Sequence, residues 1–431
     1  MWGIDNDSHD IIGTRFNPVA AKIGNEELES WLLRLLAPKI NFRFYTLQLE
    51  DLSVVVMLEI SAASHHPVQF KNTEYIRVGS YKKKLKDFPE KERALWRIFD
   101  QIPYERAITV EHVSGEEVLK LLDYPAYFDL LDLPLPDGRA AILNTLEGDG
   151  LIQACEAGDW NITNLGALLF AKKLDSFSSL KRKAMRVVHY KGRGRTETLR
   201  EQIGGKGYAN GFEGLINFIM TLVPTNEVIE KALRRSVPMF PELAVRELVA
   251  NALIHQDLFV TGAGPMVEIF DDRMEITNPG VPLVDTQRFL DTPPKSRNEA
   301  MASLMRRFRI CEERGSGIDK VVAQVEYHQL PAPYFEVPEG YTRIVLFAHR
   351  PLSEMDKAER IRACYLHACL KWVMRDYLTN ASLRERLGVE EKNKASVSRY
   401  IREAVEAGVI KAFDEEAAKK QMKYVPFWAA V

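Results

Sequence analysis

The sequence has little of what marks secreted, membrane-spanning or disulfide-stapled proteins. Its 431 residues include only 4 cysteines, too few and too widely spaced for a disulfide framework. No apolar run reaches the roughly eighteen residues of a membrane span, and we expect no secretory signal. These features predict a protein of the reducing cytoplasm with no membrane partner.

The charge balance excludes another class of protein. Lys and Arg number 58 against 60 Asp and Glu, which gives a formal net charge of -2. A nucleic-acid coat that is basic over its whole surface is therefore excluded, and any contact with phosphate must come from local patches. With 46% hydrophobic and 27% charged residues, and neither repeats nor low-complexity segments, the chain should fold almost throughout into about two to four domains.

Apolar periodicity divides the chain into four parts and predicts an α+β multidomain protein. Residues 1–90 alternate strand-like runs with an amphipathic helix, as a small α+β domain does. Residues 91–159 read as a helical connector. Residues 160–350 form a mixed region whose motifs are densest over 238–347, and residues 351–431 form a compact module of helices and a strand.

A small group of potential metal ligands lies near the start of the last part. Cys364, His367 and Cys369 fall within about two turns of one apolar helix, and no fourth ligand stands nearby. A structural zinc site needs four ligands. We therefore favour a role in the helix core over a zinc site.

Two motifs of the central part have residue types suited to a nucleotide site. Residues 242–254 have helical periodicity, which puts Glu247 and Asn251 four residues apart on one face. A hairpin follows, turning at Asp271-Asp272, and its second strand runs into Asn278-Pro279-Gly280. The spacing thus places a carboxylate and an amide on one wall.

A glycine loop supplies the third motif. Arg314-Gly315-Ser316-Gly317 stands directly before a helix predicted over residues 319–325, a geometry that offers free backbone N–H groups to phosphate. The other common phosphate loop is missing, because Gly205-Lys206 is followed by Gly207 and lacks the upstream glycine that such a loop needs. Each motif alone is more often a solvated helix face or a plain turn, so the ordered set of three carries the prediction.

This order resembles that of the GHKL ATPases, the superfamily of gyrase, heat-shock chaperones, histidine kinases and MutL-type proteins, whose Bergerat fold is an α/β sandwich. The resemblance implies that Glu247 activates water and that Asn251 holds Mg²⁺. It also implies that ATP lies under a glycine lid. That lid consists of Arg314, Gly315, Ser316 and Gly317.

The resemblance has one departure and one open assignment. Asn278, in the box that ends at Gly280, stands where the superfamily normally has an aspartate that accepts the adenine amino group, which puts base selectivity in question. His255 directly follows the helix of the first motif. It is expected either to contact the residues that bind ATP or to cap that helix.

The whole chain is also similar to a narrower family, the ATP-binding transcriptional regulators with a Schlafen-type AlbA-like amino-terminal domain and a RecG-like carboxy-terminal domain. The phrases that carry this similarity are Arg246 to His255, Glu275 to Gly280, and Ser296-Arg297-Asn298. In the first domain, Gly3 to Gly13 and Tyr75 to Ser80 look like the second half of the AlbA-like fold. We therefore expect part of that domain to lie upstream of Met1 or to be missing, and no nuclease residue is carried over.

The carboxy-terminal part has the order of a winged helix-turn-helix: a helix and turn over 378–388, a second helix over 393–407, then a strand. Its second helix offers donors suited to phosphate and base edges. These are Lys394, Ser398, Arg399 and Arg402. A module used for packing or dimerisation is the alternative.

A second basic stretch includes Arg193 and Arg195, in the glycine-rich exit of a predicted strand. It could contact nucleic acid or the triphosphate, or could protect an exposed edge strand from pairing. Together these features predict an ATP-binding and nucleic-acid-binding regulator with ATP and Mg²⁺ as cofactors, DNA as a more probable partner than RNA, and a homo-oligomer left open. The alternatives are a nucleic-acid-processing or anti-phage ATPase or nuclease component, and a scaffold that binds no nucleotide. Weak Mg²⁺-dependent ATP hydrolysis is left undecided.

Overall fold

The computed structural model describes residues 1–430 apart from several short gaps. The gaps are 41, 50–52, 61–62, 64–66, 80, 102, 156–157, 231–232, 312–314 and 419–420, and residues 97–101, 226–230 and 233–237 are described as backbone only. Contacts divide the chain into two compact units, residues 1–107 and 108–431, which are treated separately below. Within the described part of the chain, no helix combines the length and the apolar character needed to cross a bilayer.

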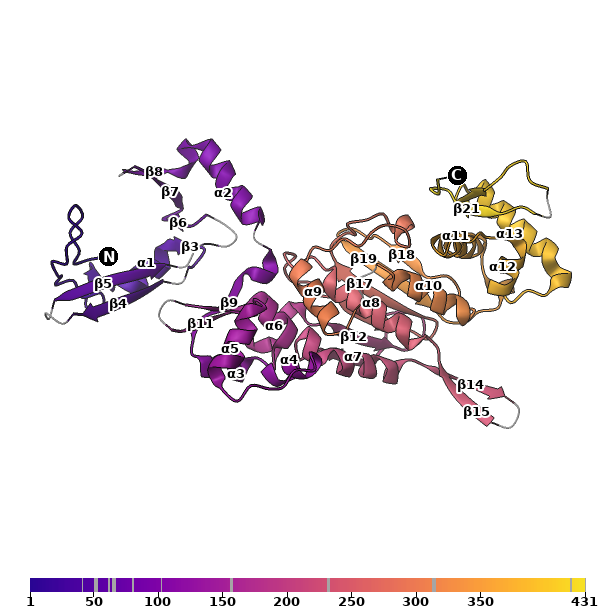
Figure 1. The fold of residues 1–431 in the computed structure, drawn as a ribbon, viewed down its shortest axis with the longest axis horizontal. Helices are drawn as coiled ribbons and strands as arrows, with labels where there is room; N and C mark the ends of the chain where they lie inside the picture. The colour runs from indigo at the N-terminus through magenta and orange to yellow at the C-terminus, as the bar shows by residue number, and fades with distance from the viewer. Residues whose placement is uncertain are drawn as a thin grey trace. The chain divides into compact units, whose positions relative to one another are not determined.

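The first unit consists of small antiparallel sheets with two helices among its described residues (Figure 1). Its elements are β1 (Lys22–Ile23), β2 (Glu26–Glu27), α1 (Leu28–Leu35), β3 (Leu36–Ala37), β4 (Phe42–Gln48), β5 (Val54–Ile60), β6 (Gln69–Phe70), β7 (Thr73–Val78), β8 (Tyr81–Lys84) and α2 (Pro89–Gln101). Strands β4 and β5 form a hairpin, and β3, β6, β7 and β8 form a sheet. Near the start of the chain Ile4 pairs with Ile11, and Trp2 pairs with the buried Val56.

The second unit opens with a three-stranded sheet and three helices. In chain order these are β9 (Ile108–Val113), α3 (Gly115–Leu121), α4 (Tyr124–Leu130), α5 (Arg139–Gly148), β10 (Ile152–Ala154) and β11 (Trp160–Thr163). The sheet has the order β10-β11-β9. The sequence predicts the helices but not β9 or β10, because β10 has only three residues and the alternation of apolar and polar residues in β9 stops after Glu111.

A six-stranded sheet forms the centre of this unit, in the order β13-β12-β16-β17-β19-β18. The elements of this region are α6 (Asn164–Phe170), β12 (Arg186–Tyr190), β13 (Thr198–Ile203), α7 (Tyr208–Leu222), β14 (Thr225–Glu230), β15 (Leu233–Pro238), α8 (Glu242–Ile254), β16 (Met266–Ile269), β17 (Arg273–Pro279), α9 (Glu299–Arg307), α10 (Gly317–Tyr327), β18 (Tyr334–Glu336) and β19 (Tyr341–Phe347). Strands β12 and β16 are parallel, and the other neighbours are antiparallel.

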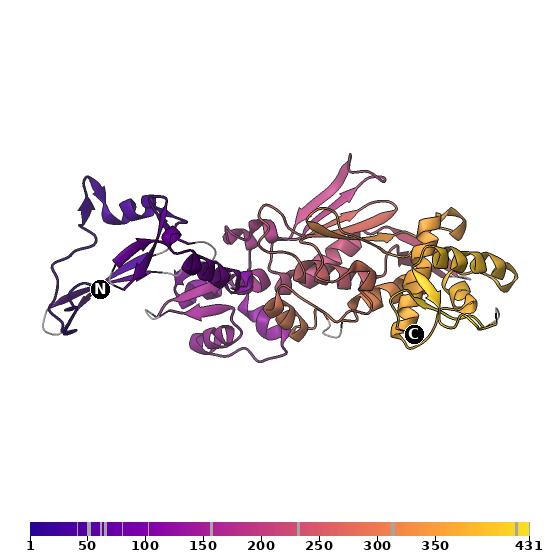
Figure 2. The same ribbon diagram turned by 90° about the horizontal axis from the view of Figure 1, so that it is seen from above.

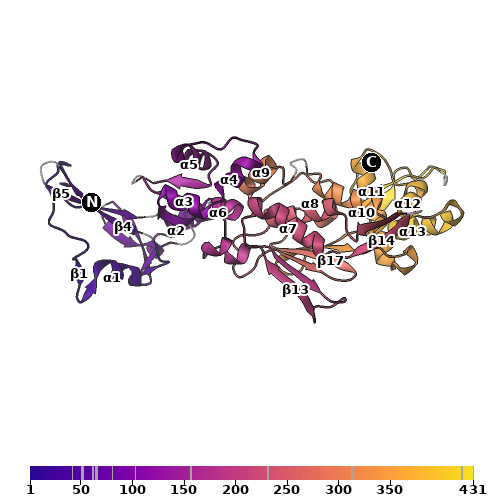
Figure 3. The ribbon, with the colours of Figure 1, turned by 90° about the horizontal axis from the view of Figure 1, so that it is seen from below.

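Helices α7, α8 and α10 form a layer over one face of this sheet, as Figures 1 and 2 show from two directions. Alternate strand residues such as Val267, Ile269 and Ile276 are buried, as expected for the face of a sheet that packs against helices. Strand β13 is one of the two edge strands, visible at the side of the sheet in Figure 3, and all its residues are exposed. The mixed α+β architecture predicted from the sequence is confirmed.

The last part of the second unit is built on helix α11. Its elements are α11 (Lys357–Val373), α12 (Asn380–Arg386), α13 (Lys394–Glu406), β20 (Ile410–Ala412) and β21 (Tyr424–Pro426). The two strands pair with each other, and Leu378 bridges to Tyr424. Cys364 and Cys369 are fully buried in this core and His367 is 4% exposed, so their interpretation as core residues of one helix is confirmed.

A buried polar cluster joins α10 to the helices that follow it. The Nδ1 atom of His367 lies 2.9 Å from a carboxylate oxygen of Glu326, and its Nε2 lies 3.1 Å from the Ser382 hydroxyl. The buried Arg386 guanidinium lies 3.4 Å from the same carboxylate and donates to the Leu330 carbonyl oxygen at 2.6 Å. Elements α10, α11 and α12 are therefore held together by charge-assisted contacts as well as by apolar packing.

Candidate functional site

Helix α8 carries the two polar residues of the first motif. It begins after Pro241, and side chains on nearly all its sides are buried, among them Val245, Leu248 and Val249. Its periodicity brings Glu247 and Asn251 to one wall of a cavity of about 670 Å³. A cavity of this size lies within the range of about 300–1,000 Å³ that small-molecule sites occupy.

The glycine loop closes on the same two residues. A Cβ atom added at Gly317 would lie 2.9 Å from Oε2 of Glu247 and 3.6 Å from Nδ2 of Asn251. Glycine is therefore the residue that lets the start of α10 approach this carboxylate so closely. Gly315 has a φ of +70°, the left-handed region that favours glycine, and its α-carbon faces Pro294.

Most of the residues singled out in the sequence lie around this cavity. Those that line it are Glu247, Asn251, His255, Asn278, Gly315 and Gly317. Gly280 and Ser316 are not among the lining residues, and Arg314 lies outside the described residues. Residues separated by up to 70 positions, the distance in sequence from Glu247 to Gly317, thus share one site.

Gly280 and Ser316 have structural positions next to the site. Gly280 has a φ of +98°, and a Cβ atom there would lie 2.8 Å from that of Asp257, so the chain can turn at this point only with glycine. Its carbonyl oxygen accepts a hydrogen bond from the Thr342 hydroxyl at 2.7 Å. Ser316 precedes the first residue of α10, and its carbonyl oxygen accepts from the Lys320 N–H at 3.0 Å.

Two lining residues have distinct electrostatic properties. Burial, with a smaller contribution from the nearby Arg297 guanidinium, lowers the pKa of His255 to about 4, so its imidazole is neutral at pH 7. Asn278 is buried and donates through Nδ2 to the Pro279 carbonyl oxygen at 3.1 Å. Its Oδ1 has no hydrogen-bond partner within the described part of the chain and can accept one from a ligand.

The cavity includes residues that the sequence motifs do not identify. Among the described residues, three basic side chains line it: Lys295, Arg297 and Arg306. Arg297 was noted in the sequence only as part of a family phrase. The segment between η5 (Thr286–Arg288) and α9 has no apolar periodicity, so no signal in the sequence could bring it to this wall.

Cys311 also lines the cavity. Burial raises the pKa of its thiol to about 11, so it is protonated at pH 7 and behaves as a small apolar side chain there.

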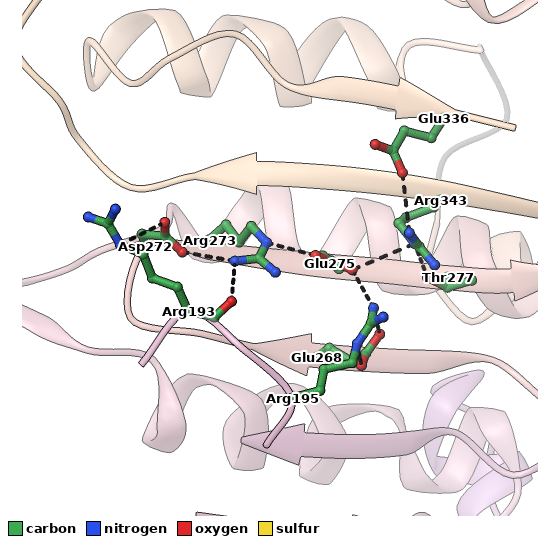
Figure 4. Close-up of polar contacts among 9 residues, drawn as sticks. All are labelled: Arg193, Arg195, Glu268, Asp272, Arg273, Glu275, Thr277, Glu336 and Arg343. Carbon is green, nitrogen blue, oxygen red and sulfur yellow. Dashed lines mark hydrogen bonds and ion pairs between the residues drawn. The ribbon is translucent and has the colours of Figure 1, made fainter. Parts of the chain in front are cut away.

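Arg195 lies on the other side of the sheet, held by two buried carboxylates (Figure 4). Its Nε and Nη2 atoms donate to Glu268 at 2.6 and 2.8 Å, and Nη2 also donates to Glu275 at 2.8 Å. The two glutamates are opposite each other on β16 and β17 and are almost fully buried. Without a cation between them, these like charges would repel at close range.

Further arginines complete this network. Arg273 donates to Glu275 at 2.7 Å and to the Arg193 carbonyl oxygen at 3.0 Å, and Arg343 Nε lies 3.6 Å from Glu275 (Figure 4). The Arg193 side chain is exposed and lies 3.3 Å from Asp272. Engagement of Arg195 with two buried acids gives it a structural function that competes with any contact to phosphate.

The basic residues of α13 have a different environment. Lys394, Ser398, Arg399 and Arg402 are all exposed. Arg399 and Arg402 each lie 3.9 Å from an acid one turn along the helix. Contacts this long are weak, although Glu403 is itself largely buried, and both guanidinium groups are more than half exposed, so they can also reach a ligand.

Comparisons with known proteins match two segments of the chain. Residues 1–86 match the family model described as "Schlafen, AlbA_2", and residues 262–346 match the model described as "Putative ATP-dependent DNA helicase recG C-terminal". The predicted architecture, an AlbA-like domain followed by a RecG-like ATPase-type domain, is therefore confirmed. The second match includes Asn278, Gly315 and Gly317, while Glu247 and Asn251 lie just before it.

Solved structures include a similar protein. The chain resembles the crystal structure of the DIP2311 protein from Corynebacterium diphtheriae, with 19% identity and a TM-score of 0.47 over 98% of this chain and 82% of that one. No curated protein matches the chain.

Proposed function

We propose that this chain is an ATP-binding, nucleic-acid-binding regulator whose nucleotide site is the cavity beside α8. One observation carries the proposal: Glu247 and Asn251 of the first motif and Gly317 of the glycine loop, far apart in the sequence, meet within a few ångströms at one cavity. In this proposal the six-stranded sheet with α7, α8 and α10 is a GHKL-type sandwich. A domain of the RecG-like type implies use of nucleotide and Mg²⁺, and the described residues fit both.

The fit to Mg²⁺ rests on ligand chemistry. The part of the chain described contains no cluster of three or more His, Cys, Asp or Glu that would form a dedicated metal cage. A nucleotide-bound Mg²⁺ does not need one, because it keeps waters and phosphate oxygens as ligands and takes one or two from protein. Asn251, next to Glu247 on the cavity wall, supplies a suitable amide oxygen.

The proposed mechanism assigns a role to each of the three residues. Bound Mg²⁺ would supply charge for the phosphates. Asn251 would hold it, and the backbone N–H groups at the start of α10 would bind the phosphates, because Gly317 lets this helix approach the cavity wall. Glu247 orients a water molecule and accepts its proton.

Calorimetry with Mg²⁺ and ATP tests this site. Wild type should bind ATP, Asn251→Ala should bind it at least about tenfold more weakly, and Glu247→Gln should retain binding while any hydrolysis is lost. Asn144→Ala on the exposed face of α5 is a matched control and should bind as wild type does. Equal affinity for wild type and Asn251→Ala would remove Asn251 from the site.

We further propose that α11, α12, α13 and the strands β20 and β21 form a winged helix-turn-helix that binds nucleic acid, DNA more readily than RNA. The order of these elements and the exposed, loosely paired cations of α13 support this. Replacing Arg399 and Arg402 with alanine should weaken duplex DNA binding. It should also reduce the slope of log affinity against log salt by about one unit per lost contact.

A charge-matched control distinguishes a specific interface from a general effect. Arg139 and Arg309 are exposed, lie away from α13, and pair with exposed acids. Their double alanine variant should leave the affinity and its salt slope close to wild type. An equal loss in both double variants would refute an interface at α13.

A further inference from the structure

We propose that Lys295 binds the terminal phosphates of the nucleotide, as a second phosphate-binding element beside the glycine loop. The inference rests on the proposed function, since it concerns the same cavity. Lys295 lines this cavity, its side chain is exposed, and it has no ion pair or hydrogen bond within the described residues. Its ammonium group is therefore free to bind an anion that enters the cavity.

The segment that carries Lys295 is tied down on its carboxy-terminal side. Asn298 donates through Nδ2 to the carbonyl oxygens of Ile254 and Gln256 at 2.8 and 2.9 Å. Arg297 donates to the carbonyl oxygen of Val281 at 2.6 Å and to that of His255 at 3.3 Å. Arg297 lines the cavity, but its hydrogen bonds go to backbone carbonyl oxygens near the end of α8.

The amino-terminal side of the segment packs on the glycine loop. Cδ of Pro294 lies 3.0 Å from the position that a Cβ atom of Gly315 would occupy. Pro293 and Pro294 restrict the backbone directly before Lys295, because each proline ring fixes its own φ and the second also restricts the residue before it. Lys295 therefore stands on a short rigid segment between the glycine loop and the anchored Arg297.

The charges around the cavity also favour a phosphate-binding role for Lys295. Lys295 and the first residue of α10, Gly317, line the same cavity, and the start of an eleven-residue helix attracts anions through its free N–H groups. The carboxylate of Glu247 lies in the same wall and would repel a phosphate by itself. A nearby ammonium group offsets that repulsion and favours ligands with more phosphate charge.

The test compares nucleotides that differ only in phosphate number. Binding of ATP, ADP and AMP, each with Mg²⁺, is measured by calorimetry for wild type, Lys295→Ala, Lys295→Arg and Lys120→Ala. Lys120, an exposed lysine of α3 outside the cavity, provides the matched control. Lys295→Ala should weaken ATP binding about tenfold, ADP binding less and AMP binding little, while Lys295→Arg restores part of the ATP affinity.

The outcomes separate this inference from the proposed function. If wild type binds ATP and Lys295→Ala binds it equally well, or loses ATP and AMP affinity to the same extent, Lys295 is not a phosphate ligand although the nucleotide site stands. If wild type binds no nucleotide at all, the proposed function and this inference both fail. Equal thermal unfolding of the four proteins excludes a folding defect, which is not expected for an exposed lysine.

Discussion

Substitution of Arg195 tests whether the network on the sheet is structural. Arg195→Ala would leave Glu268, which is 1% exposed, without the two hydrogen bonds that Arg195 donates. Breaking a buried pair by removing one partner costs roughly 3–5 kcal/mol, and the half-exposed arginine puts this case near about 3 kcal/mol. Glu275 retains Arg273, so the loss should centre on Glu268.

A neighbouring pair on the same sheet provides a matched control. Arg186 and Arg195 have the same side-chain exposure, 49%, but Glu201, the partner of Arg186, is 41% exposed. Arg186→Ala should therefore cost less than about 1 kcal/mol. Adding Glu268→Gln to Arg195→Ala removes the stranded charge and should recover much of the lost stability.

The loss of stability can be measured by hydrogen exchange of the backbone amides of β16 and β17 in the full chain. This measurement reports the opening of these strands and not the unfolding of the first unit. The reasoning is refuted if Arg195→Ala increases exchange no more than Arg186→Ala does. The Arg195→Ala, Glu268→Gln protein also tests the alternative function, since a phosphate contact by Arg195 would appear as weaker nucleic-acid binding in a folded protein. We expect no such change.

Three further predictions concern α10 and its surroundings. Burial raises the pKa of Asp319 from 3.8 to about 6. The protonated carboxyl therefore contributes stability below pH 3.8, and this contribution is lost as the pH rises through 6. The melting temperature of Asp319→Asn, relative to that of wild type, should therefore increase from pH 4 to pH 7. Gly317→Ala should weaken ATP binding about tenfold, because the added Cβ atom would clash with Glu247 and move the phosphate-binding start of α10, whereas Gly214→Ala, with open space around it, should not. Glu326→Ala should destabilise the carboxy-terminal helices by about 3 kcal/mol in urea unfolding, because it strands a buried arginine of α12, and unchanged stability would contradict this.

Local patterns were sufficient to predict the parts of the site that lie on regular elements. The helical period places Glu247 and Asn251 on one face, and α8 has that face at the cavity. The Asp271-Asp272 turn lies between β16 and β17 as expected. In both cases the residues involved are only a few positions apart in the sequence. Their relative placement is therefore fixed by the helical repeat or by the turn, and it can be predicted from the sequence.

Long-range contacts explain what could not be predicted. Arg195 reads as an exposed cation in the sequence, because its partners Glu268 and Glu275 lie 73 and 80 residues away. Lys295 lies in a segment without periodicity, and the long-range contacts of Pro294, Arg297 and Asn298 fix that segment beside the glycine loop. Such pairings depend on how the sheet and loops close in space, and no local period encodes them.

Two parts of the second unit both have helices followed by two short paired strands, but they differ in surface chemistry. Residues 108–163 follow the order strand, three helices and two paired strands, whereas helices α11, α12 and α13 precede the paired strands β20 and β21 without such a first strand. The exposed positions of α5 carry Ala140, Ala141 and Asn144, with Arg139 as their only cation, whereas α13 exposes Lys394, Arg399 and Arg402. Because binding to nucleic acid depends on cations that can release counterions from phosphate, this difference supports the proposal that nucleic acid binds at α13.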